Sequence, residues 1–431
     1  MWPRLHDSDM KPLRILVRGP YPPPFGGIAT ALATVVPWLV ERGHEVVFMS
    51  DSLTPAVEHP GPGVTVVRFA SRHHWRRLFN PLRMPSNIGR ACRLFRLGAT
   101  VRETLSGVVI ADVVDDLIRE HGIDAMCVYM VHAGLFLAAD ARPRPVPVVL
   151  TVLGELFEDP VLAAKPRFIR AVLTKADALL SPSHYCADAV KLAGLDPAHV
   201  RVHYLGINLQ KFHPERRADD VAASLGVRPD QDVILFLARF NDEMGIDAML
   251  ACVRRVLPRH PQAVFVFAGA AGPRSADIHR AAADSQGRVI VQENAPMDVL
   301  PGLMSISSML VAPTRRGHPC CGMSIKEAMA SGKPVVATRT GGHLEVIDDG
   351  VTGHLIACAA NGDADQEDFV SRIDTLLADP ARRRDMGRAA RARAVALFDV
   401  VETARILETT LLDARDATVR APDTPAQRVA S

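Results

Sequence analysis

Residues 313–353 contain the groups whose types and spacing best suit phosphate chemistry. A strand ends at Pro313, a polar loop follows, and Gly322 precedes helical residues that include Glu327. The backbone N–H groups of Gly322, Met323 and Ser324 would lie at the first turn of that helix, where unpaired donors and the helix macrodipole attract anions. Glu327, about one turn deeper, can accept hydrogen bonds from two adjacent hydroxyl groups. The stretch therefore predicts a site for a diphosphate attached to a ribose.

Two runs of alternating strand and helix text position these groups. The first run predicts a helix over 28–40, and its predicted strands cover 14–19, 46–49, 64–68, 125–130, 146–152 and 178–181. The second run starts after a polar stretch near 207–230, and its predicted strands cover 233–238, 264–268, 289–291, 309–312 and 334–337. Such alternation is typical of doubly wound parallel sheets, whose ligands bind beyond the carboxyl ends of the strands.

The length and this alternation predict two α/β domains with a cleft between them. We expect a Rossmann-like, acceptor-binding N-terminal domain over 1–206 and a Rossmann-like, donor-binding C-terminal domain over 207–395. A helix over 396–415 is expected to pack back on the first domain. The polar residues 416–431 are expected to be disordered.

Composition excludes several classes of protein. Of the 431 residues, 48 % are hydrophobic and 23 % charged, and the net charge of +2 gives no sign of a nucleic-acid partner. The first eleven residues are polar, and no apolar run reaches the roughly 20 residues of a membrane span. The seven cysteines are scattered and form no metal-binding pair. We therefore expect a cytoplasmic protein without a structural metal.

The stretch 313–353 resembles glycosyltransferase family 4. This large family of retaining glycosyltransferases includes sucrose synthase and glycogen-synthase-like enzymes and has the GT-B fold. The residues that match the family pattern are Glu327-Ala328-Met329-Ala330, Gly332, Pro334-Val335, Gly341-Gly342, Glu345 and Thr352-Gly353. The resemblance covers nearly the whole chain. It implies a nucleoside-diphosphate sugar as donor, a small-molecule or glycan acceptor, no metal cofactor and retention of anomeric configuration.

Further residues match the family in chain order. Gly26-Gly27 correspond to a glycine loop whose missing side chains let the backbone approach the donor, although a plain turn is an alternative. The resemblance assigns Arg239 to the arginine that binds the diphosphate, a catalytic role suited to a guanidinium fork. His132, at the end of a predicted strand, corresponds to a histidine that reaches the donor sugar, with a structural histidine as the alternative.

Two departures from the family pattern affect the chemistry. The family's second diphosphate cation, a lysine five residues after the arginine, is Met244 here, and the first glutamate of the paired-glutamate motif is Pro319. His318, next to Pro319, is a candidate for sugar or acceptor contact. We interpret the adjacent Cys320 and Cys321 as packing or loop residues rather than as metal ligands or nucleophiles.

Two further segments have alternative interpretations. Glu155 follows a Thr-Val-Leu-Gly stretch that resembles a family motif, and it could contact an acceptor or cap the following helix. Residues 72–102 interleave arginines with aromatic and aliphatic residues. They could form a solvated basic helix packed on the N-terminal domain, contact an anionic membrane surface peripherally, or face an anionic acceptor.

The function predicted from these patterns is sugar transfer from a nucleoside-diphosphate sugar. Two alternatives follow from the substitutions at 244 and 319. One is a specialised enzyme of secondary metabolism that uses an unusual sugar, or a thiol or other small-molecule acceptor. The other is a nucleotide-sugar-binding protein without turnover. The patterns do not distinguish the base, sugar, acceptor or oligomeric state.

Overall fold

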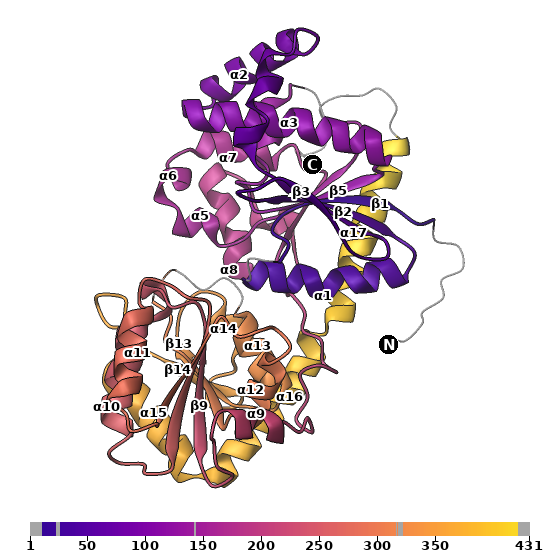
Figure 1. Ribbon diagram of the computed structural model, residues 1–431. Coiled ribbons are helices and arrows are strands. Elements are labelled where there is room, and N and C mark those ends of the chain that lie inside the picture. Colours follow the sequence, from indigo (N-terminus) through magenta and orange to yellow (C-terminus); the bar gives the residue numbers. More distant parts are fainter. Residues whose placement is uncertain (1–10, 23–25, 142–143, 316, 318–321, 421–431) are drawn as a thin grey trace. The chain divides into compact units, whose positions relative to one another are not determined.

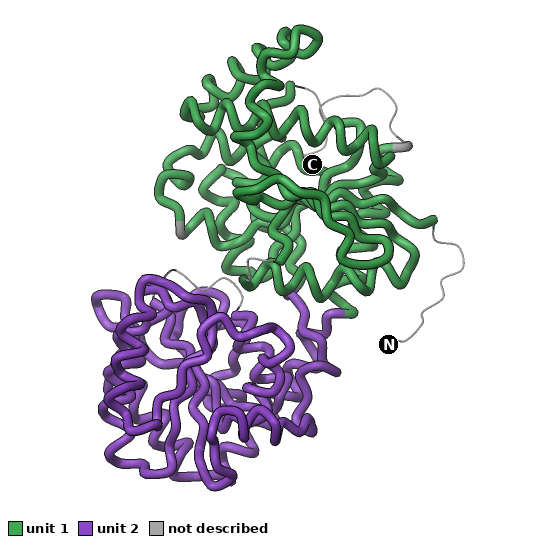
Figure 2. The backbone as a smooth tube through the Cα atoms, viewed as in Figure 1, with its two compact units in different colours: residues 1–203, 401–431 green, residues 204–400 purple. Residues whose placement is uncertain are grey.

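The computed structural model describes residues 11–22, 26–141, 144–315, 317 and 322–420. The chain divides into two compact units, the first comprising residues 1–203 and 401–431 and the second residues 204–400 (Figure 2). Each unit is an α/β domain with one largely or wholly parallel sheet. Helices cover both faces of each sheet (Figure 1).

In the first unit, eight strands of the described residues form a sheet in the order β3-β4-β2-β1-β5-β6-β7-β8. The strands are β1 (Arg14–Arg18), β2 (Glu45–Asp51), β3 (Ala56–Gly61), β4 (Val64–Phe69), β5 (Ala125–Tyr129), β6 (Val148–Thr151), β7 (Ala178–Ser181) and β8 (Val200–Val202). All neighbours pair in parallel except β3 and β4. Leu16 of β1 pairs with Val47 of β2 and with Met126 of β5, so the first strand lies in the middle of the sheet.

Helices and short 3-10 turns connect these strands. The helices of the first unit are α1 (Gly27–Glu41), α2 (Met84–Arg96), α3 (Val101–His121), α4 (Leu135–Ala139), α5 (Glu155–Glu158), α6 (Pro160–Ala163), α7 (Pro166–Leu173), α8 (His184–Ala187) and, from 401 onward, α17 (Val400–Arg420). The 3-10 turns are η1 (Ser71–His73), η2 (Trp75–Phe79), η3 (Asp188–Ala193) and η4 (Pro197–His199). The apolar faces of α3, α4 and α7 pack with β1, β5 and β6 into one buried core.

In the second unit, six strands of the described residues form a parallel sheet in the order β11-β10-β9-β12-β13-β14. The strands are β9 (Asp232–Leu237), β10 (Ala263–Gly269), β11 (Val289–Glu293), β12 (Met309–Ala312), β13 (Val335–Thr338) and β14 (Gly353–Ile356). The helices are α9 (Asp219–Ser224), α10 (Ile246–Val256), α11 (Ser275–Ala283), α12 (Leu300–Ile306), α13 (Met323–Ala330), α14 (His343–Val346), α15 (Gln366–Ala378) and α16 (Pro380–Leu397), with one 3-10 turn, η5 (Asp242–Met244).

Alternation along β9 creates a core on each face of this sheet. Ile234 and Phe236 point into the core beneath α10 and α15, whereas Val233 and Leu235 point into the core beneath α12, α13 and α16. A strand buried on both faces reads as a continuous apolar run, and for that reason its position was predictable from the sequence.

The C-terminal residues 416–431 were expected to be disordered, but the first five of them are helical. Helix α17 continues through Arg420. Asp416–Arg420 includes alanine and arginine, which favour helices, and no glycine or proline, and the first proline is Pro422. The rest of the expected tail, 421–431, lies outside the described residues.

Candidate functional site

The first strand of the second unit, β9, has β10 on one side and β12 on the other, so the connections leave it in opposite directions. Such a topological switch point opens a crevice at the carboxyl ends of the two strands. The loops after β9 and β12 meet there, because the Arg315 N–H donates a 2.9 Å hydrogen bond to the Glu243 carbonyl. Gly245 has a φ of 79°, and a Cβ atom there would lie 2.0 Å from the Pro313 carbonyl oxygen. The two loops are therefore closely packed against each other.

Helix α13 begins at this switch point. Its N-cap residue, Gly322, has φ 54° and ψ 61°, in the left-handed region that favours glycine. No side chain of the described residues caps the first turn, and the turn contains no acidic residue. The positive end of the helix dipole, at the backbone N–H groups of Met323 and Ser324, is therefore not compensated by a cap or an acidic side chain. Such a helix end suits an anionic ligand.

Glu327 lies one turn into α13, and 4 % of it is exposed. Among the described residues its carboxylate has no hydrogen-bond donor. Burial raises the pKa of Glu327 to about 8, and the Lys211 ammonium opposes that rise. A buried carboxylate without donors is costly to ionise, so this position is poised to accept hydrogen bonds from a ligand.

Arg239 follows β9 and is exposed. Its guanidinium forms no ion pair with any described residue. Two other arginines at this edge of the sheet are already paired: Arg274 with Asp242 and Arg315 with Asp363, the latter at 2.7 Å. Arg239 is thus available to an incoming anion.

Met244 packs against the hydrophobic core of the second unit, where its side chain is partly buried. It supplies neither a charge nor a polar group to the switch point. His318, Pro319, Cys320 and Cys321 lie outside the described residues, so their predicted roles stay predictions.

The first unit has its own switch point, between β1 and β5. Gly26 is the N-cap of α1, and a Cβ atom added to Gly26 would meet no atom within 4 Å. Its φ of −176° is open to any residue, so the fold itself does not require a glycine there. As in α13, the part of the chain that the structure describes provides no side-chain cap for the first turn of α1, which begins with Gly27.

His132 and Glu155 both lie near the end of β5. The His132 Nε2 atom is 3.2 Å from an Asp159 carboxylate oxygen, and both side chains are partly exposed. The Val131 N–H donates a 2.7 Å hydrogen bond to Glu155 Oε1, so Glu155 fixes the loop that presents His132. Neither sequence interpretation of Glu155, acceptor contact or helix cap, included this bond.

Two structural features of the candidate sites were not predicted. Met130, just before this loop, has a φ of 77°, which is a strained conformation for a side chain other than glycine and is typical of functional loops. His343 lies behind the N-cap of α13, where its ring is 3.5 Å from the position of a Cβ on Gly322. Burial lowers the pKa of His343 to about 4, so the ring is neutral near pH 7. The sequence signal nearest to His343 was the Gly341-Gly342 pair of the family pattern, and it did not indicate a buried, neutral histidine.

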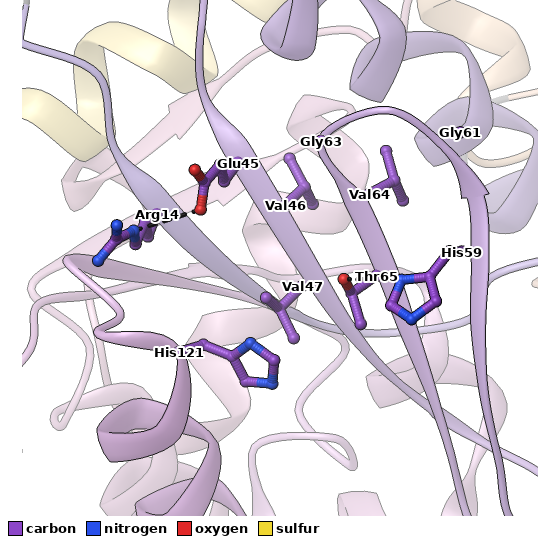
Figure 3. A pocket seen from close by; sticks show the side chains of 10 residues that line it. All are labelled: Arg14, Glu45, Val46, Val47, His59, Gly61, Gly63, Val64, Thr65 and His121. Carbon is purple, nitrogen blue, oxygen red and sulfur yellow. Dashed lines mark hydrogen bonds and ion pairs between the residues drawn. The ribbon is translucent and has the colours of Figure 1, made fainter.

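A hollow of about 300 Å³ opens in the first unit at the opposite, amino-terminal edge of its sheet. Its lining includes Arg14 and Glu45, which begin β1 and β2 and form a 3.2 Å ion pair, together with His59 and His121 (Figure 3). Because ligands of open α/β sheets bind at the carboxyl ends of the strands, this hollow is not the predicted site.

Metal-binding and membrane-spanning features were sought in the same residues. Within the described ranges, no three His, Cys, Asp or Glu side chains come close enough together to hold a metal ion. No helix there combines the length and the apolar character that crossing a bilayer requires.

Comparison with known families agrees with this geometry. The model described as "Glycosyl transferases group 1" matches residues 218–393, and the "Glycosyl transferase 4-like domain" matches residues 26–206. The chain belongs to the GT-B glycosyltransferases of the GT4 type. The two matched segments correspond to the two Rossmann-like units, and each contains one of the switch points.

Curated relatives match this chain in sequence over part of its length. The chain is 30 % identical over 252 residues to alpha-maltose-1-phosphate synthase of Mycolicibacterium smegmatis, a match that covers 56 % of this chain and 64 % of that protein. Curated relatives are matched over about half to two thirds of their own length.

Solved structures share the fold over most of the chain. Sucrose-phosphate synthase from Thermosynechococcus elongatus superimposes with a TM-score of 0.73 at 18 % identity, covering 94 % of this chain and all of that one. An Anabaena protein in complex with UDP-glucose superimposes with a TM-score of 0.67 at 19 % identity, covering 93 % of this chain and all of that one. These likenesses establish the GT-B fold of this glycosyltransferase.

Proposed function

We propose that this protein transfers a sugar from a nucleoside-diphosphate sugar to a small-molecule or glycan acceptor. The observation that carries the proposal is the buried Glu327 carboxylate, which lacks a donor among the described residues and lies one turn behind the uncapped start of α13. In this arrangement the ribose hydroxyls donate to Glu327 while the diphosphate binds the backbone N–H groups of Met323 and Ser324.

The same groups supply the catalytic assistance that we propose. As the bond between sugar and diphosphate breaks, negative charge grows on the leaving diphosphate. The dipole of α13 and the guanidinium of Arg239 stabilise that charge, so we propose that no metal ion is needed. Turnover that is unchanged by EDTA is the expected result, and turnover that depends on added Mg²⁺ would contradict this part of the proposal.

His132 and the glycines at 26–27 are the proposed sugar-side contacts of the first unit. The open space at Gly26 and the exposed position of His132 support this assignment. The scattered cysteines favour the cytoplasm as the place of reaction. We further propose retention of anomeric configuration, which NMR of the first-formed product tests.

Thermal denaturation with UDP, GDP, ADP and dTDP tests donor binding, because a ligand that binds only the folded state raises the melting temperature. UDP and UDP-glucose are the first ligands to try, since the Anabaena structure of the same fold holds UDP-glucose. We expect one base to stabilise the protein and Glu327→Ala to abolish that effect.

Release of nucleoside diphosphate from the matching sugar donor then tests turnover. A ligand that stabilises the protein without release would favour a binding protein over an enzyme. Met244 makes this measurement informative, because it stands where the family pattern has a second cation and its side chain packs against the hydrophobic core.

A further inference from the structure

Helix α2 exposes a row of large apolar residues to solvent, although its Leu94, on the side toward the protein, is buried. Ile88 and Phe95 are 58 % and 50 % exposed, and Met84 is exposed as well. These three residues, at spacings of four and seven, lie on one face of the helix. Arg83 and Arg90 occupy the opposite face, toward α3. A surface helix usually turns its large apolar residues toward the core, so this exposed row is unusual.

Ion pairs hold α2 in this orientation. Arg90 donates to Asp112 and Asp115 at 2.6 Å each, and to Asp140 at 2.7 Å. Arg83 donates to Asp116 at 2.6 Å. Because these carboxylates are largely buried beneath the helix, turning the apolar face inward would leave several charges unpaired in the protein. The apolar face is therefore fixed outward.

The exposed apolar surface extends along the chain before α2. Trp75 and Phe79 of η2 are 53 % and 61 % exposed, and their rings make an edge-to-face contact with centroids 5.9 Å apart. Leu82, in the turn that leads to α2, is 93 % exposed. We call the residues Trp75, Phe79, Leu82, Met84, Ile88 and Phe95 the α2 patch. Each of these six residues is exposed and they lie close together along the chain, which makes this segment a candidate interaction site.

The charged side chains of the segment that carries the α2 patch have one sign. Residues 71–102 contain eight arginines and no aspartate or glutamate. Arg76, Arg96 and Arg102 are exposed and form no ion pair within the described ranges. An apolar face bordered by unpaired arginines, with a tryptophan among its apolar residues, is complementary to a layer of acyl chains beneath anionic headgroups.

We propose that the α2 patch docks this protein on the surface of a membrane that contains anionic lipids. Membrane docking goes beyond the proposed sugar transfer and does not depend on it. A second copy of the chain fits the patch less well, because a symmetric contact would bring the same unpaired arginines face to face. The lipid layer instead offers apolar depth and negative charge together.

Sedimentation of the full chain with vesicles tests the proposal. We expect binding to vesicles of phosphatidylcholine and phosphatidylglycerol, and weaker binding to phosphatidylcholine alone. The double variant Ile88→Ser, Phe95→Ser should lose at least tenfold in partitioning, because two inserted apolar side chains are removed. Arg76→Gln and Arg96→Gln should each lose about fivefold on the anionic vesicles only.

The matched control is the double variant Leu53→Ser, Val57→Ser, which removes two exposed apolar side chains of the same unit outside the patch. It should bind as the native protein does, and circular dichroism should show that both double variants are folded. In addition, the Trp emission of the native protein should shift to the blue on binding, and this shift should be absent in Trp75→Phe.

Three results would overturn the proposal: no binding to either vesicle, equal binding by the patch variant and its control, or no effect of the arginine substitutions. A dimer in sedimentation velocity that the patch variant abolishes, in a protein that ignores vesicles, would assign the patch to a second copy instead.

Discussion

At the scale of single residues, the buried Glu327 lowers the stability of the empty protein and strengthens the binding of a ligand. Its pKa of about 8 in the folded protein exceeds the ordinary value of 4.5 because the carboxyl group is buried. Below pH 4.5 Glu327 is protonated in both the folded and the unfolded protein, and its contribution to the free energy of unfolding is fully present. This contribution is lost as the pH rises through 8, because ionising the buried group is unfavourable. Ligand hydroxyls that donate to the carboxylate would offset the loss.

The first prediction follows from that balance. Glu327→Gln should raise the free energy of unfolding of the empty protein at pH 8 by on the order of 3 kcal/mol, because glutamine has no charge to bury. The same variant should weaken nucleoside-diphosphate binding by about 1.5 to 3 kcal/mol. Urea unfolding at pH 5 and pH 8, with calorimetric titration of the nucleotide, checks both effects. A variant that binds as tightly as the native protein would contradict the placement of the ribose.

A second prediction concerns the proton. If ligand hydroxyls donate to an ionised Glu327, binding at pH 7 must release a proton that the empty protein holds. Calorimetric titration in two buffers of different ionisation enthalpy should show this release. The release should be smaller in Glu327→Gln. Identical proton counts in the two proteins would mean that the carboxyl group does not ionise on binding.

Gly26 gives a third prediction at the same scale. Because a Cβ atom would meet no atom of the described residues within 4 Å, Gly26→Ala should leave the melting temperature within about 1 °C of the native value. It should nevertheless lower sugar transfer by tenfold or more if the donor approaches the backbone there. Gly61→Ala is the control, since Gly61 is equally open and lies in β3. Equal activity of both variants would leave Gly26 as a simple turn residue.

At the scale of secondary-structure elements, helix α17 is fastened to the first unit by one buried acid. Glu408 accepts from Arg42 Nε at 2.6 Å and from His44 Nε2 at 2.8 Å. The Leu13 N–H donates a 2.9 Å hydrogen bond to the other ring nitrogen, Nδ1, so Nε2 is the ring nitrogen that donates to Glu408. Burial would raise the pKa of Glu408, but the hydrogen bonds from His44 and Arg42 outweigh it and lower the pKa.

The fourth prediction is that Glu408→Ala destabilises the first unit by about 3 kcal/mol near pH 7, because it leaves buried donors without an acceptor. Since the pKa of Glu408 is lowered, its stabilisation is present above pH 4.5 and is lost as the pH falls through the lowered value. The difference from the native protein in urea unfolding should therefore shrink in acid. Glu402→Ala, which removes an exposed pair with Arg405 of the same helix, should cost less than about 1 kcal/mol.

The elements predictable from the sequence are those whose pattern reflects burial alone. Strands such as β7 and β12 were predicted with their observed bounds, because apolar runs between helices specify central parallel strands. The antiparallel edge strand β3 was missed, since it is exposed along its length and contains Pro60. The strand β8 was missed because it has only three residues, and β14 was missed because it begins with Gly353 and His354 rather than with an apolar run.

Helix α2 shows a different limit of sequence patterns. Its spacing is that of an amphipathic helix, and the usual rule would turn Ile88 and Phe95 inward. The orientation is decided instead by Asp112, Asp115 and Asp116, which lie on α3 more than 15 residues later. Similarly, the pattern around Glu327 predicted a ribose-binding carboxylate but not its raised pKa, which depends on tertiary burial.

At the scale of the whole molecule, the chain contains two doubly wound units, each with a switch point and an uncapped helix start. Within the described residues, only the second switch point adds a buried carboxylate without donors and an exposed, unpaired arginine. The hollow between β1 and β4 is a competing location for a ligand, because it is recessed and contains the polar side chains of Arg14 and His121.

The fifth prediction is that hydrogen exchange of the whole protein shows which of these two locations, the second switch point or the hollow, binds the nucleotide. The nucleoside diphosphate that raises the melting temperature should slow exchange at the start of α13 and in residues 238–245, because ligand contacts suppress local opening there. Exchange at the amino ends of β1 and β2 should be unchanged. Arg239→Gln should weaken the protection in the second unit, since a bound phosphate would lose its guanidinium partner. Protection centred on Arg14 and Glu45 instead would move the nucleotide site to the hollow of the first unit.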